Sequence, residues 1–161
     1  MEEGAQVIVA EFKNESGSAA TKELGCDFQK CDVSKRSNWE ALLEYVDTRY
    51  GKLDSVINNA GTSYRNKATI EVTENKFDLV FAVNVKAIYH SYNVLVPYIK
   101  KQGTGESFVT IGSVAAVNPT LGLTYVPLSA EGPDLLADND SCPGGKCVES
   151  RCHARQQIIG S

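Results

Sequence analysis

The sequence has few of the features that mark membrane-bound, secreted or nucleic-acid-binding proteins. No apolar run approaches the roughly 20 residues that a membrane-crossing helix needs. The segment from Met1 to Ala5 is acidic and small, so the sequence predicts no secretory signal peptide. The formal net charge is −4, which gives no basic surface for nucleic acid or for anionic lipid.

The cysteines do not fit a disulfide framework or a metal site. There are five, an odd number, and without a secretory signal this favours reduced thiols and a cytoplasmic location. Cys142, Cys147, Cys152 and His153 have a C-x4-C-x4-C-H spacing, which is not a zinc pattern. We therefore expect no metal site.

The amino-acid composition is typical of a globular protein. Hydrophobic residues make up 42% and charged residues 22% of the 161 positions, enough for one domain with a real core. Up to about residue 125, apolar strand-like segments alternate with amphipathic ones, which predicts parallel strands joined by right-handed helical crossovers. The expected strands are 4–11, 28–33, 53–58 and 106–113, and the expected helices are 13–25, 37–51 and 73–100.

Local signals predict where the first two helices begin and end. Gly25 and Gly51 are suited to helix termination. Ser37 and Glu40 have the spacing of a capping box, in which two side chains satisfy the first free amides of a helix. Trp39 begins an apolar pattern of helical period and is expected in the core.

The third predicted helix has one polar residue on its apolar face. A buried amide costs about 1–3 kcal/mol unless it is hydrogen-bonded, so Asn84 requires specific partners. It is either a satisfied core residue or a functional one. The expected buried stripe is Phe77, Val80, Phe81, Asn84, Ile88, Tyr92, Leu95 and Ile99.

An acid ends the first predicted strand. Glu11 is either a solvated strand end or a carboxylate that accepts hydrogen bonds from the ribose hydroxyls of a dinucleotide. In the second case it would repel a 2′-phosphate, which favours NAD over NADP.

The segment Asn58-Asn59-Ala60-Gly61 ends the third predicted strand with two amides, although Asn has a low strand propensity. This motif resembles the signature of the short-chain dehydrogenase/reductase family. Members of that family are NAD(P)-dependent oxidoreductases that interconvert alcohols and ketones. Several further motifs follow the family order as far as about residue 125.

The resemblance implies roles for other residues. Asp32 and Val33 match the pair that lies beside the adenine ring. Asn84 matches an Asn that distorts its helix and holds a proton-relaying water, and Ser113 matches the serine that hydrogen-bonds the substrate. The implied cofactor-binding residues are Glu11, Asp32, Val33, Asn59, Ala60, Gly61 and Lys86, and the implied catalytic residues are Ser113, Asn84 and Tyr125.

One departure from the family concerns phosphate binding. The family's T-G-x-x-x-G-x-G turn is absent from the sequence, and Met1 stands where the helix after that turn would finish. We therefore expect a partial Rossmann-like, doubly wound parallel sheet that lacks its first strand. Since that strand lies centrally in the family order, the strands at Val7 and Val56 are expected to have no common neighbour and to expose unpaired edges.

A second departure concerns the family's catalytic Tyr-x-x-x-Lys, in which the tyrosine is the acid or base. Family spacing from Ser113 places the tyrosine at position 126, which is a valine. Tyr125 is one residue early, and Ser129 stands where its lysine would be. Catalysis by this chain is therefore expected to be impaired.

Beyond residue 125 the character of the sequence changes. Proline, glycine and aspartate interrupt every apolar period, so residues 1–125 are predicted as the dinucleotide-binding domain and 126–161 as a disordered tail.

Three hypotheses about the function of the chain remain. One is an NAD- or NADP-dependent oxidoreductase that acts on a small molecule. A second is a non-catalytic remnant that associates with relatives, or with itself, through the 73–100 helix. A third gives the cysteine-rich tail a metal-binding or interaction role.

Overall fold

The computed structural model describes residues 4–103, 107–112, 123 and 125. Strands and helices alternate, as the sequence predicts. The strands are β1 (Ile8–Glu11), β2 (Asp27–Lys30), β3 (Ser55–Asn58) and β4 (Ser107–Thr110). The helices are α1 (Asn14–Leu24), α2 (Arg36–Tyr50), α3 (Glu74–Phe81) and α4 (Ala87–Gln102), with a 3-10 turn at Thr69–Glu71 and a π turn at Ala82–Lys86.

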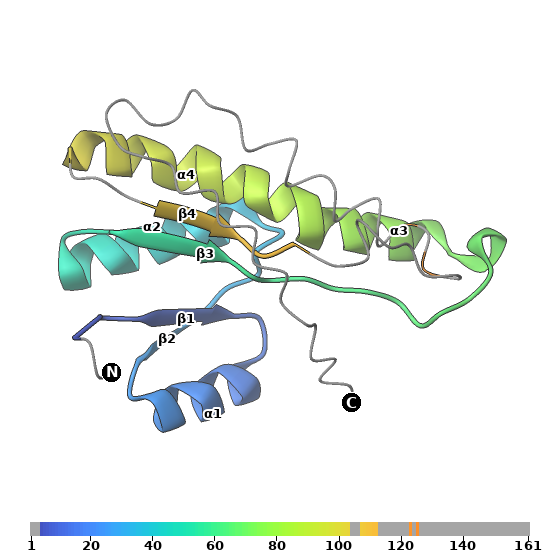
Figure 1. Cartoon of the computed structure of the whole chain (residues 1–161), viewed down its shortest axis with the longest axis horizontal. Coiled ribbons are helices and arrows are strands. Elements are labelled where there is room, and N and C mark those ends of the chain that lie inside the picture. The colour runs from blue at the N-terminus through green and yellow to red at the C-terminus, as the bar shows by residue number, and fades with distance from the viewer. Residues whose placement is uncertain (1–3, 104–106, 113–122, 124, 126–161) are drawn as a thin grey trace.

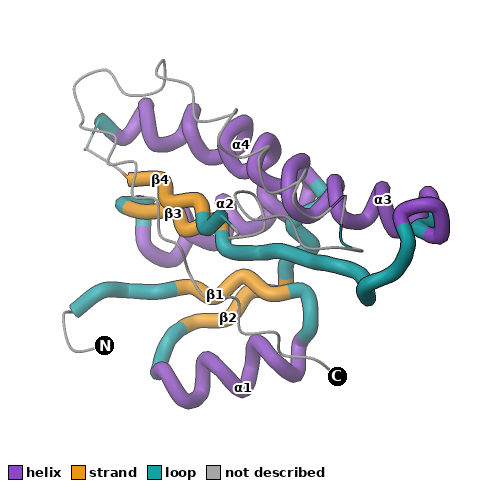
Figure 2. The backbone as a smooth tube through the Cα atoms, turned by 45° about the vertical axis from the view of Figure 1, so that its right-hand side comes forward, coloured by secondary structure: helices purple, strands orange, loops and turns teal. Residues whose placement is uncertain are grey.

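The described strands form two separate parallel pairs. β1 pairs with β2, in a register that places Ile8 beside Asp27. β3 pairs with β4, in a register that places Ser55 beside Ser107. Within the described residues no strand joins β1 to β3, although the two face each other and run in the same direction (Figures 1 and 2). The expectation of two strands without a common neighbour is confirmed for this part of the chain.

Helix α1 packs against β2 through a glycine. A Cβ atom added at Gly17 would lie 2.1 Å from the ring of Phe28, so only glycine allows this approach. The helix ends as predicted, at Gly25 with φ 66°. The strands lie between α1 on one side and α4 on the other (Figure 1).

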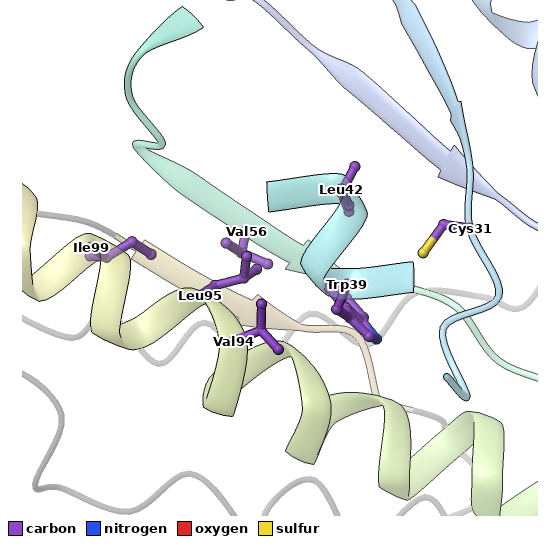
Figure 3. Packing of buried hydrophobic residues seen from close by; sticks show 7 residues of the cluster. All are labelled: Cys31, Trp39, Leu42, Val56, Val94, Leu95 and Ile99. Carbon is purple, nitrogen blue, oxygen red and sulfur yellow. The ribbon is translucent and has the colours of Figure 1, made fainter. Parts of the chain in front are cut away.

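The main core connects both strand pairs. Trp39 and Leu42 of α2 lie between residues of both pairs and of α4, and Trp39 is 6% exposed, as its position in the apolar pattern predicts. Its indole N–H donates to the carbonyl of Val33 at 2.8 Å. The buried members of the cluster are Cys31, Trp39, Leu42, Val56, Val94, Leu95 and Ile99 (Figure 3).

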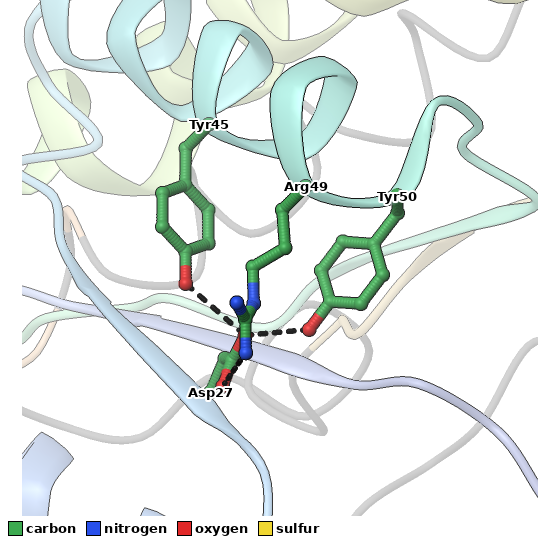
Figure 4. Close-up of polar contacts among 4 residues, drawn as sticks. All are labelled: Asp27, Tyr45, Arg49 and Tyr50. Atoms are coloured by element: carbon green, nitrogen blue, oxygen red, sulfur yellow. Dashed lines mark hydrogen bonds and ion pairs between the residues drawn. The ribbon is translucent and has the colours of Figure 1, made fainter.

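A polar cluster ties the other end of α2 to β2. The Asp27 carboxylate accepts hydrogen bonds from the hydroxyls of Tyr45 (3.1 Å) and Tyr50 (2.5 Å), and it also pairs with Arg49 (Figure 4). The Tyr50 hydroxyl and then the Arg49 guanidinium hold the pKa of Asp27 below its ordinary value. Burial, together with the bond to Asp27, raises the pKa of Tyr45.

The predicted capping box of α2 is wrong. The residue before the helix is Lys35, and no side chain caps the helix there. Ser37 lies inside the helix, and the carboxylate of Glu40 pairs instead with Arg36, at 2.8 Å. Asn38 accepts the backbone N–H of Asp32 at 2.8 Å. The helix start is therefore fixed by contacts with the preceding turn, which also ends β2 three residues earlier than the sequence predicts.

The long third helix contains a π turn at Ala82–Lys86, which inserts one residue into the helix. Four residues of the predicted buried stripe are buried as expected: Val80, Ile88, Leu95 and Ile99. The prediction is wrong for Phe77, which is exposed, and for Phe81, Asn84 and Tyr92, which are half-buried. The buried residues of α4 are Ala87, Ile88, His90, Ser91, Val94, Leu95 and Ile99.

The stretch Glu74–Gln102 is long and apolar enough, by length and composition, to cross a membrane. The sequence led us to expect no such segment. Core helices of soluble proteins meet the same criterion, and 39% of the most apolar window is buried inside this fold. Here the apolar face of α4 packs on the main core.

Candidate functional site

The carboxyl ends of all four strands define the candidate site. Parallel strands end at one edge of their sheet, and ligands of open α/β folds bind there. Glu11 ends β1 and Asn58 ends β3, while Asp32 lies two residues beyond the end of β2. The arrowheads of the strands point to the same side of the molecule (Figure 1).

Glu11 is a half-buried carboxylate with one local contact. Its Oε1 accepts the backbone N–H of Lys13 at 3.1 Å, immediately before α1 begins. Its other oxygen has no hydrogen-bond partner among the described residues. The side chain therefore retains acceptor capacity at the strand edge.

Asp32 shapes the turn that leads into α2. Its Oδ1 accepts the backbone N–H of Ser34 at 3.0 Å and the Ser34 hydroxyl at 2.6 Å. Its Oδ2 has no hydrogen-bond partner within the described part of the chain. Asp32 and Glu11 lie near each other, because the backbone N–H of Cys31 donates to the carbonyl of Glu11 at 3.0 Å. Val33 packs against the main core.

The Asn58–Gly61 segment leads from β3 into an exposed loop. Asn59, Ala60 and Gly61 are exposed at the strand edge. The side-chain Nδ2 of Asn58 is buried and has no hydrogen-bond partner in the part of the chain that the structure describes. Such a group is expected to be satisfied in a complete binding site.

Asn84 fixes this loop to the π turn. Its Oδ1 accepts the backbone N–H of Thr62 at 2.8 Å, and its Nδ2 donates to the carbonyl of Thr62 at 3.1 Å. The prediction that Asn84 requires specific hydrogen-bond partners is confirmed, and it lies where the helix is distorted. Asn84 thus holds the backbone immediately after Gly61 in place. π turns are frequent at functional sites.

Lys86 and His90 lie one helical turn apart beyond Asn84. Lys86 is exposed, whereas His90 is buried and its Nδ1 has no partner among the described residues. Burial, together with the positive charges of Lys86 and Arg36, lowers the pKa of His90, while a hydrogen bond to the Ser34 backbone opposes this. The imidazole is therefore neutral at neutral pH.

Tyr125 belongs to a second, smaller cluster beside α3. Its ring meets the Phe77 ring edge-on, with 5.2 Å between centroids. Its backbone N–H donates at 3.1 Å to the hydroxyl of Tyr64, which is 6% exposed. Sequence reasoning missed Tyr64, whose only signal is an aromatic residue within a polar loop. The cluster also contains Val80.

Ser113 and residues 126–161, the predicted tail, lie outside the described residues. Among the residues that are described, no group of three metal-ligating side chains is found. Burial and the nearby Asp32 charge raise the pKa of the Cys31 thiol to about 11, so this cysteine is unreactive.

Comparison with known proteins identifies the family to which this architecture is related. A family model for short chain dehydrogenases matches residues 1–125. A 4-formylbenzenesulfonate dehydrogenase of Comamonas testosteroni is 41% identical over 95 residues, which cover 59% of this chain and 37% of that protein. A 3-oxoacyl-[acyl-carrier-protein] reductase of Thermotoga maritima is 30% identical over 136 residues, covering 81% of this chain and 54% of that protein. The chain thus spans about a third to a half of the length of these relatives.

Solved structures share the fold at lower identity. The apo form of LigO from Sphingobium has a TM-score of 0.80 and 18% identity, covering 84% of this chain and 52% of that chain. A 3-ketoacyl-(acyl-carrier-protein) reductase from Brucella melitensis, solved in complex with NADH, has a TM-score of 0.76 and 24% identity. The likeness covers 80% of this chain and 55% of the Brucella protein.

Proposed function

This chain belongs to the short-chain dehydrogenase family of oxidoreductases, and we propose that it binds the adenosine half of a nicotinamide dinucleotide at its carboxyl strand edge. The observation that carries this proposal is the pair of carboxylates, Glu11 and Asp32, at the ends of neighbouring strands. Each has one oxygen in a local hydrogen bond and a second without a partner among the described residues. They fit the donor groups of a ribose and an adenine.

The two carboxylates have different tasks in this proposal. Glu11 accepts hydrogen bonds from the ribose hydroxyls, and its charge repels a 2′-phosphate, which favours NAD over NADP. Asp32 and Val33 line the adenine. The bound nicotinamide would supply or accept the hydride that interconverts an alcohol and a ketone.

The loop after β3 completes the proposed site. Asn59, Ala60 and Gly61 present backbone next to the cofactor, and Asn84 holds this loop through its two bonds to Thr62. Ser113 is proposed to bind the substrate oxygen of a small alcohol or ketone. Val126 and Ala130 stand where the family has its catalytic tyrosine and the lysine that binds the nicotinamide ribose, so we expect weak cofactor binding and little turnover.

Titration of the chain with NADH and NADPH, followed by calorimetry, tests this proposal. We expect NADH to bind more tightly than NADPH. Glu11→Gln should weaken NADH binding about tenfold, because a hydrogen bond to a charged group is worth roughly 1.5–3 kcal/mol, and it should reduce the preference over NADPH. Glu23→Gln, at an exposed carboxylate of α1, is the matched control. Equal affinities of Glu11→Gln and the parent chain for NADH would contradict the proposed role.

A non-catalytic role is the second candidate, and exposed apolar side chains on the long helix favour it. Leu79 of α3 is 46% exposed and Tyr89 of α4 is 49% exposed. We propose that these residues belong to a surface through which the chain associates with a second copy or with a relative. Sedimentation over a range of concentrations should show association that Tyr89→Ser weakens. A monomer at every concentration would exclude self-association.

A further inference from the structure

We propose that His90 of α4 is a positioning residue for cofactor binding. In its neutral form it holds residues 32–34, here named the adenine turn, in the conformation that binds adenosine, and its protonation releases them. The inference rests on the proposed function for the identity of the ligand. The link between His90 and the adenine turn is argued from contacts of their own.

Side chains of α2 hold the first two residues of the adenine turn. The Oδ1 of Asn38 accepts the backbone N–H of Asp32 at 2.8 Å. The indole N–H of Trp39 donates to the carbonyl of Val33, also at 2.8 Å. Neither an amide nor an indole gains or loses a proton near neutral pH. These two contacts are therefore independent of pH.

The third residue of the turn is held from α4. The His90 imidazole donates a hydrogen bond to the backbone carbonyl of Ser34. Its Nδ1 has no partner among the described residues, so the donating atom is Nε2. Of the three side chains that hold the turn, His90 is the one whose ordinary pKa, 6.5, lies close to neutral pH.

Ser34 transmits this contact to the carboxylate of the proposed site. Its backbone N–H and its hydroxyl both donate to the Oδ1 of Asp32, at 3.0 and 2.6 Å. The backbone N–H of Lys35 donates to the carbonyl of Asp32 at 2.9 Å and closes the same turn. A displacement of Ser34 therefore moves the carboxylate that lines the adenine.

The surroundings of His90 favour its neutral form. The side chain lies in the interior, with the whole residue 7% exposed. Burial first, and then the positive charges of Lys86 and Arg36, lower the pKa of His90, while the bond to Ser34 opposes them. Lys86 lies one turn before it on the same long helix, and Arg36 begins α2.

The remaining titratable groups near His90 lie on the turn and on α4. The turn segment carries Asp32 and Lys35, and the Tyr89 ring lies 5.6 Å from the imidazole, between centroids. Protonation would place a third positive charge beside Lys86 and Arg36, inside the fold, where a charge is costly. The charged imidazole is therefore expected to turn toward solvent and to leave the Ser34 carbonyl.

The direction of the pH effect follows from the lowered pKa. The folded chain takes up the proton on His90 only below the ordinary value of 6.5. The contribution of His90 to the turn is thus complete above 6.5 and is lost as the pH falls through the lower value of the folded chain. Adenosine binding should weaken over the same interval.

An NMR titration of the whole chain without cofactor, from about pH 8 to about pH 5, tests the link to the turn. It follows the imidazole Cε1–H of His90 and the backbone amide of Lys35, whose nitrogen shares a peptide bond with the Ser34 carbonyl. Both signals should change with one midpoint below 6.5. The chain has two histidines, so His153→Gln assigns the imidazole signals and is the control that leaves the turn unchanged.

Two variants at position 90 separate the hydrogen bond from the titration. His90→Gln keeps an N–H donor of similar reach but does not titrate, so its Lys35 amide signal should stay constant over this range. His90→Leu removes the donor, and its Lys35 signal at about pH 8 should lie where the parent signal lies only in acid. If the leucine variant does not fold, the parent chain and His90→Gln still decide the question.

Calorimetric titration with NAD tests the consequence for the site. Between about pH 8 and about pH 5.5 the parent chain should lose affinity for NAD about three- to tenfold, the usual worth of a hydrogen bond. His90→Gln should lose less than half as much. Because Glu11 and Asp32 are present in both chains, this comparison removes any effect of their own protonation.

Three outcomes would overturn the inference. The first is a Lys35 amide that does not follow the titration of His90 in the parent chain. The second is a His90 midpoint at or above 6.5, which would mean that the fold favours the charged imidazole. The third is an equal loss of NAD affinity in the parent chain and in His90→Gln.

Failure of the proposed function has a different signature. It would appear as no NAD binding by the parent chain at any pH, and this would remove the ligand assigned to the adenine turn. The Lys35 amide would still show whether His90 controls the turn.

Discussion

The β1–β2 and β3–β4 pairs have the same strand length and the same parallel pairing, and both pack on the main apolar core, but their further contacts differ. The β1–β2 pair is tied to α2 through the half-buried polar cluster around Asp27, and α1 packs on it through Gly17. The β3–β4 pair is covered by the buried apolar face of α4. Similar strand pairs can therefore depend on quite different interactions.

The comparison has a consequence for stability. Apolar burial depends weakly on pH and salt, whereas hydrogen bonds and ion pairs to a carboxylate depend on its charge. The β1–β2 attachment is thus expected to be the more sensitive to conditions, and the β3–β4 attachment the more sensitive to changes in side-chain volume. The following substitutions test this difference, from the largest expected effect to the smallest.

Truncation of the α4 core should have the largest effect. Ile99 is 1% exposed, so Ile99→Ala should lower the free energy of unfolding by about 2–5 kcal/mol through lost burial and a residual cavity. Ile70→Ala is a matched control, because Ile70 is 95% exposed and its truncation should change stability by less than about 0.5 kcal/mol. Urea denaturation measures both values. Equal effects would mean that α4 burial does not hold the second pair.

Filling the α1 contact should destabilise the first pair. An alanine in a helix is normally favoured over glycine by about 1 kcal/mol, but a Cβ at Gly17 would collide with Phe28. Gly17→Ala should therefore lower stability by about 1–3 kcal/mol, the usual cost of overpacking. Adding Phe28→Val should recover most of this loss. A stabilised Gly17→Ala single variant would contradict the close approach of α1 to β2.

Removal of the Asn84 amide tests the main polar contact on the long helix. Asn84→Ala leaves the N–H and C=O of Thr62 without these partners and should cost about 1–2 kcal/mol. Asn84→Asp keeps the acceptor for the Thr62 N–H and should cost less. Hydrogen exchange at the Thr62 amide should accelerate in the alanine variant only. Unchanged exchange would show that the loop is held by other contacts.

Neutralising Asp27 should alter the pH dependence of stability. The pKa of Asp27 is held below its ordinary value of 3.8. At pH values around these two pKa values, the native state therefore binds fewer protons than the unfolded chain. The stability contributed by the charged form is complete above the unfolded value and is lost as the pH falls through the lower native one. Asp27→Asn should therefore be less stable at neutral pH and should lose less stability on acidification.

Denaturation from neutral pH to below 3.8 measures this difference. Asp78→Asn, at an exposed aspartate of α3, serves as the control and should keep the acid dependence of the parent chain. Identical pH profiles for Asp27→Asn and the parent chain would show that the polar cluster does not contribute.

Most of the element order could be predicted from the sequence, and so could part of the candidate site. The alternation of strands and helices and the core position of Trp39 depend on periodicity. The need of Asn84 for hydrogen-bond partners was also apparent, but Thr62 as the partner was not. Tyr64 and the Asp27 cluster were missed, because their contacts join residues that are distant in sequence.

The sequence alone determined the helix ends at Gly25 and Gly51, because a residue with positive φ is a local requirement that glycine meets at least cost. Tertiary structure decided which polar residues join the buried face of α4. The apolar period predicted Ile88, Leu95 and Ile99 as buried, and they are, but His90 and Ser91 are buried as well. No local propensity specifies this, because the burial of a polar side chain depends on what the rest of the fold places against it. In the same way, only the folded chain brings Thr62 to the Asn84 amide.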